Sequence, residues 1–234
     1  MKHRLSKYSH LPSTKTITPW ALVEEHNEPL AKRNTLKPLF NHKGIKILYS
    51  GSLSKAHDYK LALKLARQMK ATNDIQGMMV FACQGHKRRD LEKEITTEDV
   101  NIQLRDFLPE GHLKDYLKSA DFIMVSIAKG WEGIVLPSKF FGALALGKPI
   151  LFFGSKKCEF SMWIKKYQLG FVINEEKDIP YVLHEIKKHY VDQDLYKKMS
   201  NNCKKTYMQF FSRESAINNW DSYLKNQTVV EVPV

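Results

Sequence analysis

Cysteine is scarce in this sequence, and the few cysteines that occur are far apart. The 234 residues contain three of them, Cys83, Cys158 and Cys203, and no CxxC pair. An odd number of widely separated cysteines argues against a disulfide framework and against a zinc site. It is typical of proteins from a reducing compartment.

Long apolar runs are also absent. No stretch approaches the roughly 20 apolar residues that a membrane-spanning helix needs. The basic N-terminus, MKHRLSKYSHLPSTKTITPW, lacks the apolar core of a secretory signal peptide. We therefore expect a cytoplasmic protein.

Common signatures of catalytic and cofactor sites are missing as well. The sequence has no GxGxxG or GxxxxGK[ST] loop, no GxSxG turn, no Cys/His pair at a recognisable spacing and no HxxxH-type spacing. These absences argue against a dinucleotide cofactor, a P-loop, a catalytic nucleophile and a metal site. We expect neither a cofactor nor a metal.

Positive charge, in contrast, is abundant. The chain has 37 Lys and Arg against 25 Asp and Glu, which gives a net charge of +12 at pH 7. Such an excess favours anionic partners: nucleic acid, acidic lipids or phosphate-bearing small molecules. Nucleic acid is disfavoured, because the aromatic residues do not interleave with the basic ones as on RNA-binding surfaces. The basic helices fit contact with an anionic membrane at least as well.

The hydrophobic pattern predicts an α/β fold. Segments of helical periodicity alternate with six short apolar runs, at 45–49, 77–83, 100–105, 121–127, 149–153 and 170–173. Apolar strands that alternate with helices are typical of a parallel sheet covered on both faces. We predict a Rossmann-like, doubly wound parallel sheet in a domain over residues 45–225, with extra helices at its C-terminal end. Residues 1–44 are predicted to be a linker, and residues 226–234 a tail.

Ligands of such sheets bind at the carboxyl ends of the strands. After the first strand, the loop SGSLSKAHD places Gly51, Ser52 and His57 around a tight turn. Backbone N–H groups at a helix N-terminus, with a cation nearby, suit a phosphate group. The alternative, which this segment taken alone favours, is an ordinary glycine–serine turn from strand to helix with an incidental lysine.

The loop after the fourth strand, AKGWEGIVLPSKF, ends where a helix is predicted to begin. Ser138 is a natural N-cap, and Lys139 lies in the first turn, where the helix dipole disfavours a cation. An anion bound between the lysine and the helix N-terminus would explain why a cation stands here. The alternative is a solvated lysine side chain beside an ordinary cap. Gly142 follows inside the helix, where glycine costs roughly 1 kcal/mol relative to alanine. Close approach of a ligand or of another backbone would account for it.

A third loop, FLPEGHLKDYLKSAD, follows the third strand. Its Leu108 and Pro109 lie at a strand end and could hold a flat base. The alternative is a capped turn with no ligand.

Taken in order, several motifs resemble the C-terminal, donor-binding domain of GT-B glycosyltransferases of the group 1 type. The motifs are ILYSGSLSKAHD, LPEGHLKDYLKSADFIMVSI, EGIVLPSKFFGALALGKPILF, GFVI and FFSRESAINNW. In that family the C-terminal half binds a nucleotide-diphosphate sugar, the N-terminal half binds the acceptor, and the donor site needs no metal. The resemblance implies catalytic roles for Lys139 and Glu132. It implies donor contacts for Gly51, Ser52, His57, Leu108, Pro109, Ser138, Lys139 and Gly142.

The chain departs from the family pattern at three points. Ser52 and His57 stand where most members have arginine or lysine, which leaves more of the diphosphate to Lys139. Glu132 matches the first of two family glutamates, and the second falls at Gly142. Residues 1–44 resemble only the end of an N-terminal domain and the linker that follows it.

The resemblance therefore implies a retaining glycosyltransferase half that transfers a sugar to a glycan or lipid-linked acceptor together with a separate N-terminal half. The alternative is a non-catalytic nucleotide-binding or interaction subunit derived from such an enzyme.

Overall fold

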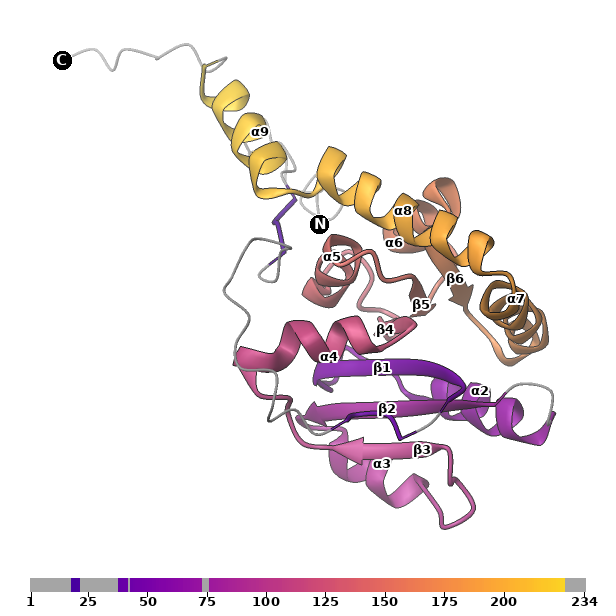
Figure 1. The fold of residues 1–234 in the computed structure, drawn as a ribbon. Coiled ribbons are helices and arrows are strands. Elements are labelled where there is room, and N and C mark those ends of the chain that lie inside the picture. Colours follow the sequence, from indigo (N-terminus) through magenta and orange to yellow (C-terminus); the bar gives the residue numbers. More distant parts are fainter. Residues whose placement is uncertain (1–17, 22–37, 42, 73–75, 226–234) are drawn as a thin grey trace.

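A computed structural model describes residues 18–21, 38–41, 43–72 and 76–225 of the chain. Its centre is a six-stranded sheet in which every neighbouring pair is parallel, in the order β3-β2-β1-β4-β5-β6 (Figure 1). The strands are β1 (Ile45–Ser52), β2 (Gly77–Gln84), β3 (Ile102–Arg105), β4 (Phe122–Ser126), β5 (Ile150–Phe153) and β6 (Gly170–Ile173). The predicted Rossmann-like, doubly wound sheet is thus confirmed.

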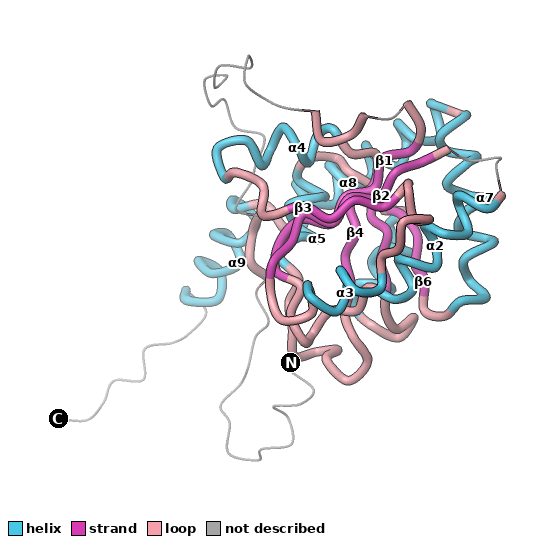
Figure 2. Tube along the Cα trace, turned by 90° about the horizontal axis from the view of Figure 1, so that it is seen from below, coloured by secondary structure: helices cyan, strands magenta, loops and turns pink. Residues whose placement is uncertain are grey.

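Helices cover both faces of the sheet (Figure 2). They are α2 (Lys60–Ala71), α3 (Arg88–Glu94), α4 (Leu113–Ser119), α5 (Ser138–Ala145), α6 (Glu159–Tyr167), α7 (Ile179–Val191), α8 (Gln193–Phe210) and α9 (Arg213–Lys225). Two single 3₁₀ turns, Glu110–His112 and Glu176–Asp178, precede α4 and α7. Among the described residues, no helix is long and apolar enough to cross a membrane.

Alternation along the strands divides the core into two clusters. In β1, Ile47 and Tyr49 face α2, α3 and α7, whereas Leu48 faces α4, α5 and α6. This is the period-2 pattern of a strand buried on both sides. The alternation explains why nearly continuous apolar runs identified the strands from the sequence.

An aromatic cluster fixes the position of α5. Phe140 packs against Phe160 with ring centroids 4.9 Å apart, and Phe141 packs against Phe211 at 5.2 Å. Trp163 lies 5.0 Å from Phe211, so rings from α5, α6 and the end of α8 meet in one place. Buried aromatic pairs of this kind add stabilisation beyond their buried area. The residue before Phe140 is Lys139, whose backbone position is therefore set by this cluster.

Strand β1 is longer than predicted. Its pairing with β2 continues through Gly51, opposite Cys83, and Ser52, opposite Gln84, so both residues belong to the strand end rather than to a loop. Gly51 has φ +123°, which glycine adopts without strain.

Part of the predicted linker packs on the domain. The amide of Ala21 donates a hydrogen bond to the Tyr207 hydroxyl at 3.2 Å, and Ala21 and Leu39 are buried in the core. Trp20, next to Ala21 in sequence, is 42% exposed. The remainder of the predicted linker (1–17, 22–37 and 42) and the predicted tail (226–234) lie outside the described residues. The domain boundaries stay a prediction.

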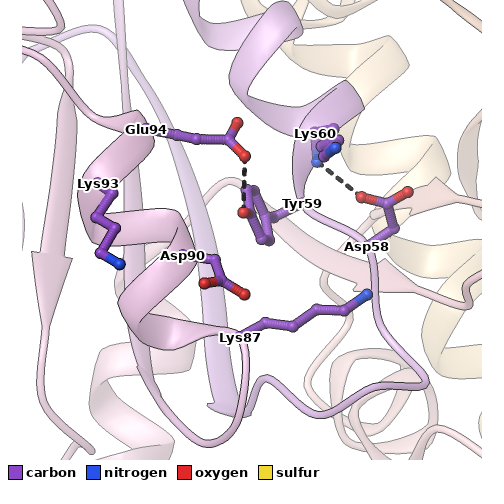
Figure 3. Close-up of a pocket in the computed structure, with 7 residues that line it drawn as sticks. All are labelled: Asp58, Tyr59, Lys60, Lys87, Asp90, Lys93 and Glu94. Carbon is purple, nitrogen blue, oxygen red and sulfur yellow. Dashed lines mark hydrogen bonds between the residues drawn. The ribbon is translucent and has the colours of Figure 1, made fainter.

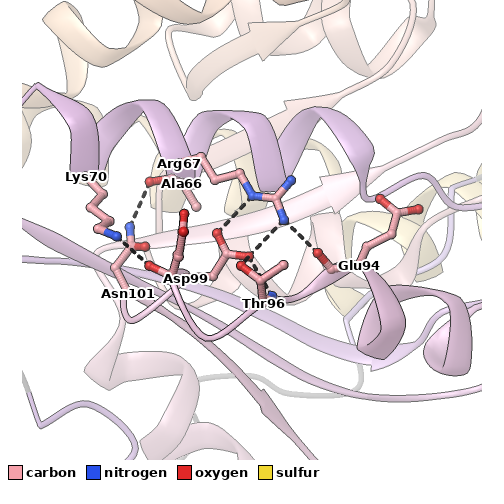
Figure 4. Close-up of polar contacts among 8 residues, drawn as sticks. Ala66, Arg67, Lys70, Glu94, Thr96, Asp99 and Asn101 are labelled. Atoms are coloured by element: carbon pink, nitrogen blue, oxygen red, sulfur yellow. Dashed lines mark hydrogen bonds and ion pairs between the residues drawn. The ribbon is translucent and has the colours of Figure 1, made fainter.

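A buried carboxylate ties α2 to the segment that leads into β3. Asp99 accepts hydrogen bonds from Arg67 Nε at 2.9 Å and Nη2 at 2.8 Å, and from the Thr96 amide at 2.9 Å (Figure 4). The same guanidinium donates to the Glu94 carbonyl at 2.7 Å. The hydrogen bonds that Asp99 accepts lower its pKa to about 2, and the one from Arg67 has the largest effect. Asp99 thus stabilises the segment that leads into β3, at the end of the sheet where the strands begin.

We expect Asp99→Asn to lower the free energy of unfolding by about 1–2 kcal/mol at pH 7. The folded pKa lies below the unfolded value of about 3.9, so this contribution is complete above that value and disappears as pH falls toward 2. Urea unfolding at pH 7 and pH 3 measures the loss of stability in the variant and how that loss depends on pH. Asp106→Asn, which removes the exposed acid paired with Arg88, is the matched control and should change stability by less than about 0.5 kcal/mol. An equal loss in the two variants, or a loss at Asp99 that is independent of pH, contradicts the prediction.

Candidate functional site

The candidate site lies where the chain changes sides of the sheet. β1 and β4 are neighbours, but β1 leads into α2 on one face and β4 leads toward α5 on the other. Loops at such a switch point diverge and leave room for a ligand at the carboxyl ends of the strands. Here the two loops are tied together, because the Ala128 amide donates to the Ala56 carbonyl at 2.8 Å and the Asp58 amide to Ser126 Oγ at 3.3 Å.

Lys139 is the second residue of α5, and its side chain reaches back to β1. Its Nζ lies 4.9 Å from the centroid of the Tyr49 ring, a cation–π contact. Its Cε lies 2.9 Å from where a Cβ would stand on Gly51. Among the described residues, no carboxylate forms an ion pair with Lys139. A desolvated ammonium without an acid is unfavourable, and a bound anion would relieve this cost.

Burial lowers the pKa of Lys139 to about 8. The side chain is therefore largely charged at neutral pH and loses its charge above pH 8. A diphosphate next to it would favour the ammonium form and raise this pKa again. The site is thus suited to an anion at neutral pH.

His57 lies beside Lys139 but is not a cation. Its Nδ1 accepts hydrogen bonds from the Ser54 amide at 3.2 Å and from Ser54 Oγ at 2.9 Å. An amide can only donate, so Nδ1 carries no proton and Nε2–H is the remaining donor. Burial, helped by the charges of Lys139 and Lys87, lowers the pKa of His57 to about 4. At neutral pH this residue can offer one N–H but no charge to a phosphate.

Ser138 was predicted to be the N-cap of α5, and this prediction is wrong. The N-cap position is Pro137, with no side-chain cap, and Ser138 is the first helical residue. The preceding Pro137 has extended φ and ψ of −75° and 102°, so the helix can only begin after it. The exposed Ser138 leaves the N–H groups of the first turn without a side-chain acceptor.

The other candidate residues lie around this centre. Glu132 Oε2 accepts a hydrogen bond from the Gly130 amide at 2.7 Å within the β4–α5 loop. A Cβ added to Gly142 would meet no atom within 4 Å, so this position of α5 faces open space. Leu108 is half-buried and packs against the core cluster on the face of the sheet that carries Leu48, and Pro109 is exposed just before a 3₁₀ turn.

The structure therefore brings Gly51, His57 and Lys139 together. Lys139 forms no hydrogen bond or ion pair with Glu132, Leu108 or Pro109. Ser52 is exposed at the end of β1, and its carbonyl accepts the Tyr49 hydroxyl at 2.5 Å.

Two residues of the site were not predicted from the sequence. Tyr49 forms the surface under Lys139, but in sequence it is an ordinary apolar strand residue. Lys87 donates from Nζ to the His57 carbonyl at 2.5 Å, although its sequence context is an exposed basic helix. Both roles arise from strand pairing and loop packing, for which the sequence carries no local signal.

A hollow of about 570 Å³ lies beside the site, between the start of α2 and α3 (Figure 3). Its lining includes three acids, Asp58, Asp90 and Glu94, together with three lysines and Tyr59, whose hydroxyl donates to Glu94 at 2.9 Å. Three carboxylates oppose a dianion, so this hollow is poorly suited to a diphosphate. Among the described residues, no group of acids, histidines and cysteines is arranged to hold a metal.

We expect Gly51→Ala to destabilise the fold by about 1–2 kcal/mol, because alanine rarely adopts this φ. Its Cβ would also approach the end of the flexible Lys139 side chain and displace it from Tyr49. Gly142→Ala is the matched control and should raise stability by up to about 1 kcal/mol, since it adds a good helix former in open space. Chemical denaturation of the two variants measures whether each substitution lowers or raises the stability of the fold. The interpretation fails if Gly51→Ala is neutral or if Gly142→Ala is the more damaging change.

Comparison with known proteins gives the same architecture. The structure of TarM superposes with a TM-score of 0.67 at 15% identity, covering 94% of this chain and 41% of that one. The pneumococcal O-GlcNAc transferase GtfA, in complex with UDP and GlcNAc, gives 0.61 at 14% identity, with 95% and 42% covered. The catalytic domain of cholesterol-α-glucosyltransferase from Helicobacter pylori gives 0.55 at 16% identity, with 71% and 99% covered. This chain thus spans about two fifths of the length of TarM and GtfA.

No curated protein sequence matches the chain. The family described as glycosyl transferases group 1 matches residues 32–206, which include the sheet, α5 and most of α8. The chain therefore belongs to the group 1 glycosyltransferases.

Proposed function

We propose that this chain provides the donor-binding side of a retaining glycosyltransferase, which transfers a sugar from a nucleotide-diphosphate sugar to a glycan or lipid-linked acceptor. The observation that carries the proposal is Lys139. Its ammonium is half-buried on the Tyr49 ring, beside Gly51, at the switch point of the sheet and without an acid partner among the described residues.

In the proposed complex the diphosphate lies at the start of α5. The N–H groups of the first turn are free of a side-chain cap, and the helix dipole favours an anion there. Lys139 supplies the charge, and His57 supplies Nε2–H. When the bond to the sugar breaks, negative charge grows on the departing diphosphate, and a fixed ammonium in a partly desolvated site stabilises it. Neither a metal nor a cofactor is part of this scheme.

The remaining contacts are assigned by resemblance to the family. Leu108 and Pro109 take the base, the open space at Gly142 accommodates the ribose, Gly51, Ser52 and Ser138 line the phosphates, and Glu132 lies near the sugar. A mutant of TarM and the transferase GtfA have been solved in complex with UDP, so UDP is the first nucleotide to test. The net charge of +12 favours approach to an anionic membrane, where lipid-linked acceptors occur.

A non-catalytic nucleotide-binding or interaction subunit is the second candidate. The observation that favours it is Gly142, which stands where the family has its second glutamate. Such a protein would bind the nucleotide at Lys139 without contributing to transfer. A separate acceptor-binding half is a partner under either proposal, and one structural neighbour is a solved GtfA/B complex.

We expect a nucleoside diphosphate to stabilise the isolated chain against heat. At 100 times its dissociation constant, the ligand should add about 2.7 kcal/mol. A thermal-shift series with UDP, GDP, ADP and dTDP measures this. Lys139→Ala should weaken binding by roughly 1.5–3 kcal/mol, because one charge-assisted contact is lost.

Lys129→Ala is the control for this series, since Lys129 is exposed on the loop that leads into α5 and carries the same charge as Lys139. An effect confined to Lys139 indicates a site, whereas equal effects indicate general electrostatic attraction. No thermal shift with any of the four nucleotides at millimolar concentration would falsify donor binding.

We expect the 234-residue chain alone to bind the donor without transferring its sugar. Transfer requires an acceptor held against the anomeric carbon. The described residues form a single six-stranded sheet, and the proposed donor site takes up the end of it where the strands finish. Without the opposite wall, a proximity contribution on the order of 7–11 kcal/mol is mostly lost, and slow donor hydrolysis remains. Radiolabelled transfer assays with and without a candidate acceptor-binding half measure the difference. Efficient transfer by the chain alone contradicts this prediction.

A further inference from the structure

The hollow between the start of α2 and α3 has no role in the proposed donor site. Its volume of about 570 Å³ is that of a small-molecule site, for which about 300–1,000 Å³ is usual. Three carboxylates, three ammonium groups and one tyrosine line it (Figure 3). We call it the charged hollow, and its lining residues are Asp58, Tyr59, Lys60, Lys87, Asp90, Lys93 and Glu94.

The two walls of the charged hollow are tied to each other. One wall is the start of α2 with the two residues before it, and the other is α3 with the residue before it. The Lys87 amide donates to the Leu53 carbonyl at 3.0 Å, and Lys87 Nζ donates to the His57 carbonyl at 2.5 Å. The Tyr59 hydroxyl donates to Glu94 Oε1 at 2.9 Å and joins the walls directly. The hollow is therefore a fixed feature of the fold.

The charged groups of the hollow do not neutralise one another by contact. Among the described residues, none of its three carboxylates forms an ion pair with any of its three lysines. The side chains of Lys60, Asp90 and Lys93 have no hydrogen-bond partner in this part of the chain either. Strong donors and strong acceptors thus face the same space with most of their capacity unused.

This balance of charges selects the class of ligand. The carboxylates oppose an anion, the lysines oppose a cation, and an apolar ligand would desolvate both without compensation. A hydroxyl group, in contrast, donates one hydrogen bond and accepts others. Neighbouring hydroxyls of a sugar ring can therefore donate to the carboxylates and accept from the ammonium groups at the same time, and each such contact is charge-assisted.

We propose that the charged hollow binds an uncharged sugar residue, at a site separate from the donor site. The hollow lies at the carboxyl ends of β1 and β2, and Lys87 contacts the backbone of His57 there. A glycan held in the hollow is thus anchored beside the place where the donor is proposed to bind. That this sugar belongs to the acceptor glycan rests on the proposed function, whereas its binding does not.

Free neutral disaccharides test the proposal: lactose, maltose and N,N′-diacetylchitobiose. We expect at least one of them to give saturation-transfer-difference NMR signals with the unaltered chain at millimolar concentration. Asp90→Ala/Lys93→Ala should weaken this binding at least about tenfold, because hydrogen bonds to two charged groups are lost. Arg89→Ala/Glu92→Ala is the matched control, since it removes one cation and one acid from exposed positions of α3 that do not line the hollow.

A second variant tests the opposite wall. Lys60→Ala removes one ammonium group and keeps the hydrogen bond from the Lys60 amide to Asp58 Oδ1, which the backbone makes. It should weaken sugar binding at least about threefold. Should Asp90→Ala/Lys93→Ala fail to fold, as judged by circular dichroism, Lys60→Ala decides the test against the same control.

Three results would overturn the proposal. The first is the absence of signals with all three disaccharides. The second is an equal loss of binding in the hollow variants and in the control, which shows that α3 is merely perturbed. The third is a loss in Lys139→Ala that the hollow variants do not share, which places the sugar in the donor site.

The same variants separate this inference from the proposed function. Asp90→Ala/Lys93→Ala should leave the thermal shift by the nucleoside diphosphate unchanged, and Lys139→Ala should leave disaccharide binding unchanged. Sugar binding in the hollow without any nucleotide binding supports this inference and rejects the donor site. Nucleotide binding without any sugar binding overturns this inference and leaves the donor site in place.

Discussion

The candidate site depends on one unfavourable placement, the partly desolvated ammonium of Lys139. Nothing in the α/β architecture requires a lysine there, since an apolar residue would extend the core of α5 and pack on Tyr49. The fold tolerates it because the aromatic cluster of α5, α6 and α8 holds the adjacent Phe140 and Phe141 rigidly. The packing on one side of α5 thus holds an unfavourably placed ammonium group on the other side.

The sheet could be predicted from the sequence because its signals are local. Runs such as GMMVFAC and DFIMVSI are too apolar for an exposed strand and too short for a buried helix, so both faces of each strand must be covered. Glycine and proline between the runs mark the turns. The boundary of β1 was the exception, because Gly51 and Ser52 resemble a loop but continue the ladder with β2.

The site could be predicted only in part. Lys139 stood out because a cation in the first turn of a helix conflicts with the helix dipole, and such conflicts between local rules often mark function. Tyr49 and Lys87 broke no local rule and so gave no signal. Ser138 was misleading, because a good capping residue after a proline cannot take the N-cap position that the proline already occupies. The neutral state of His57 was equally hidden, since it follows from burial and two tertiary cations.

The hydrogen bonding of His57 has a consequence for the chemistry that this loop can support. Because its Nδ1 is occupied by an amide and a hydroxyl of the same turn, the imidazole is held as a single tautomer. With a pKa near 4 it neither gains nor loses a proton between mildly acidic and mildly alkaline solution. It is thus a permanent dipole and not a proton carrier, which makes it a weak general base and leaves acid–base steps to groups outside this turn.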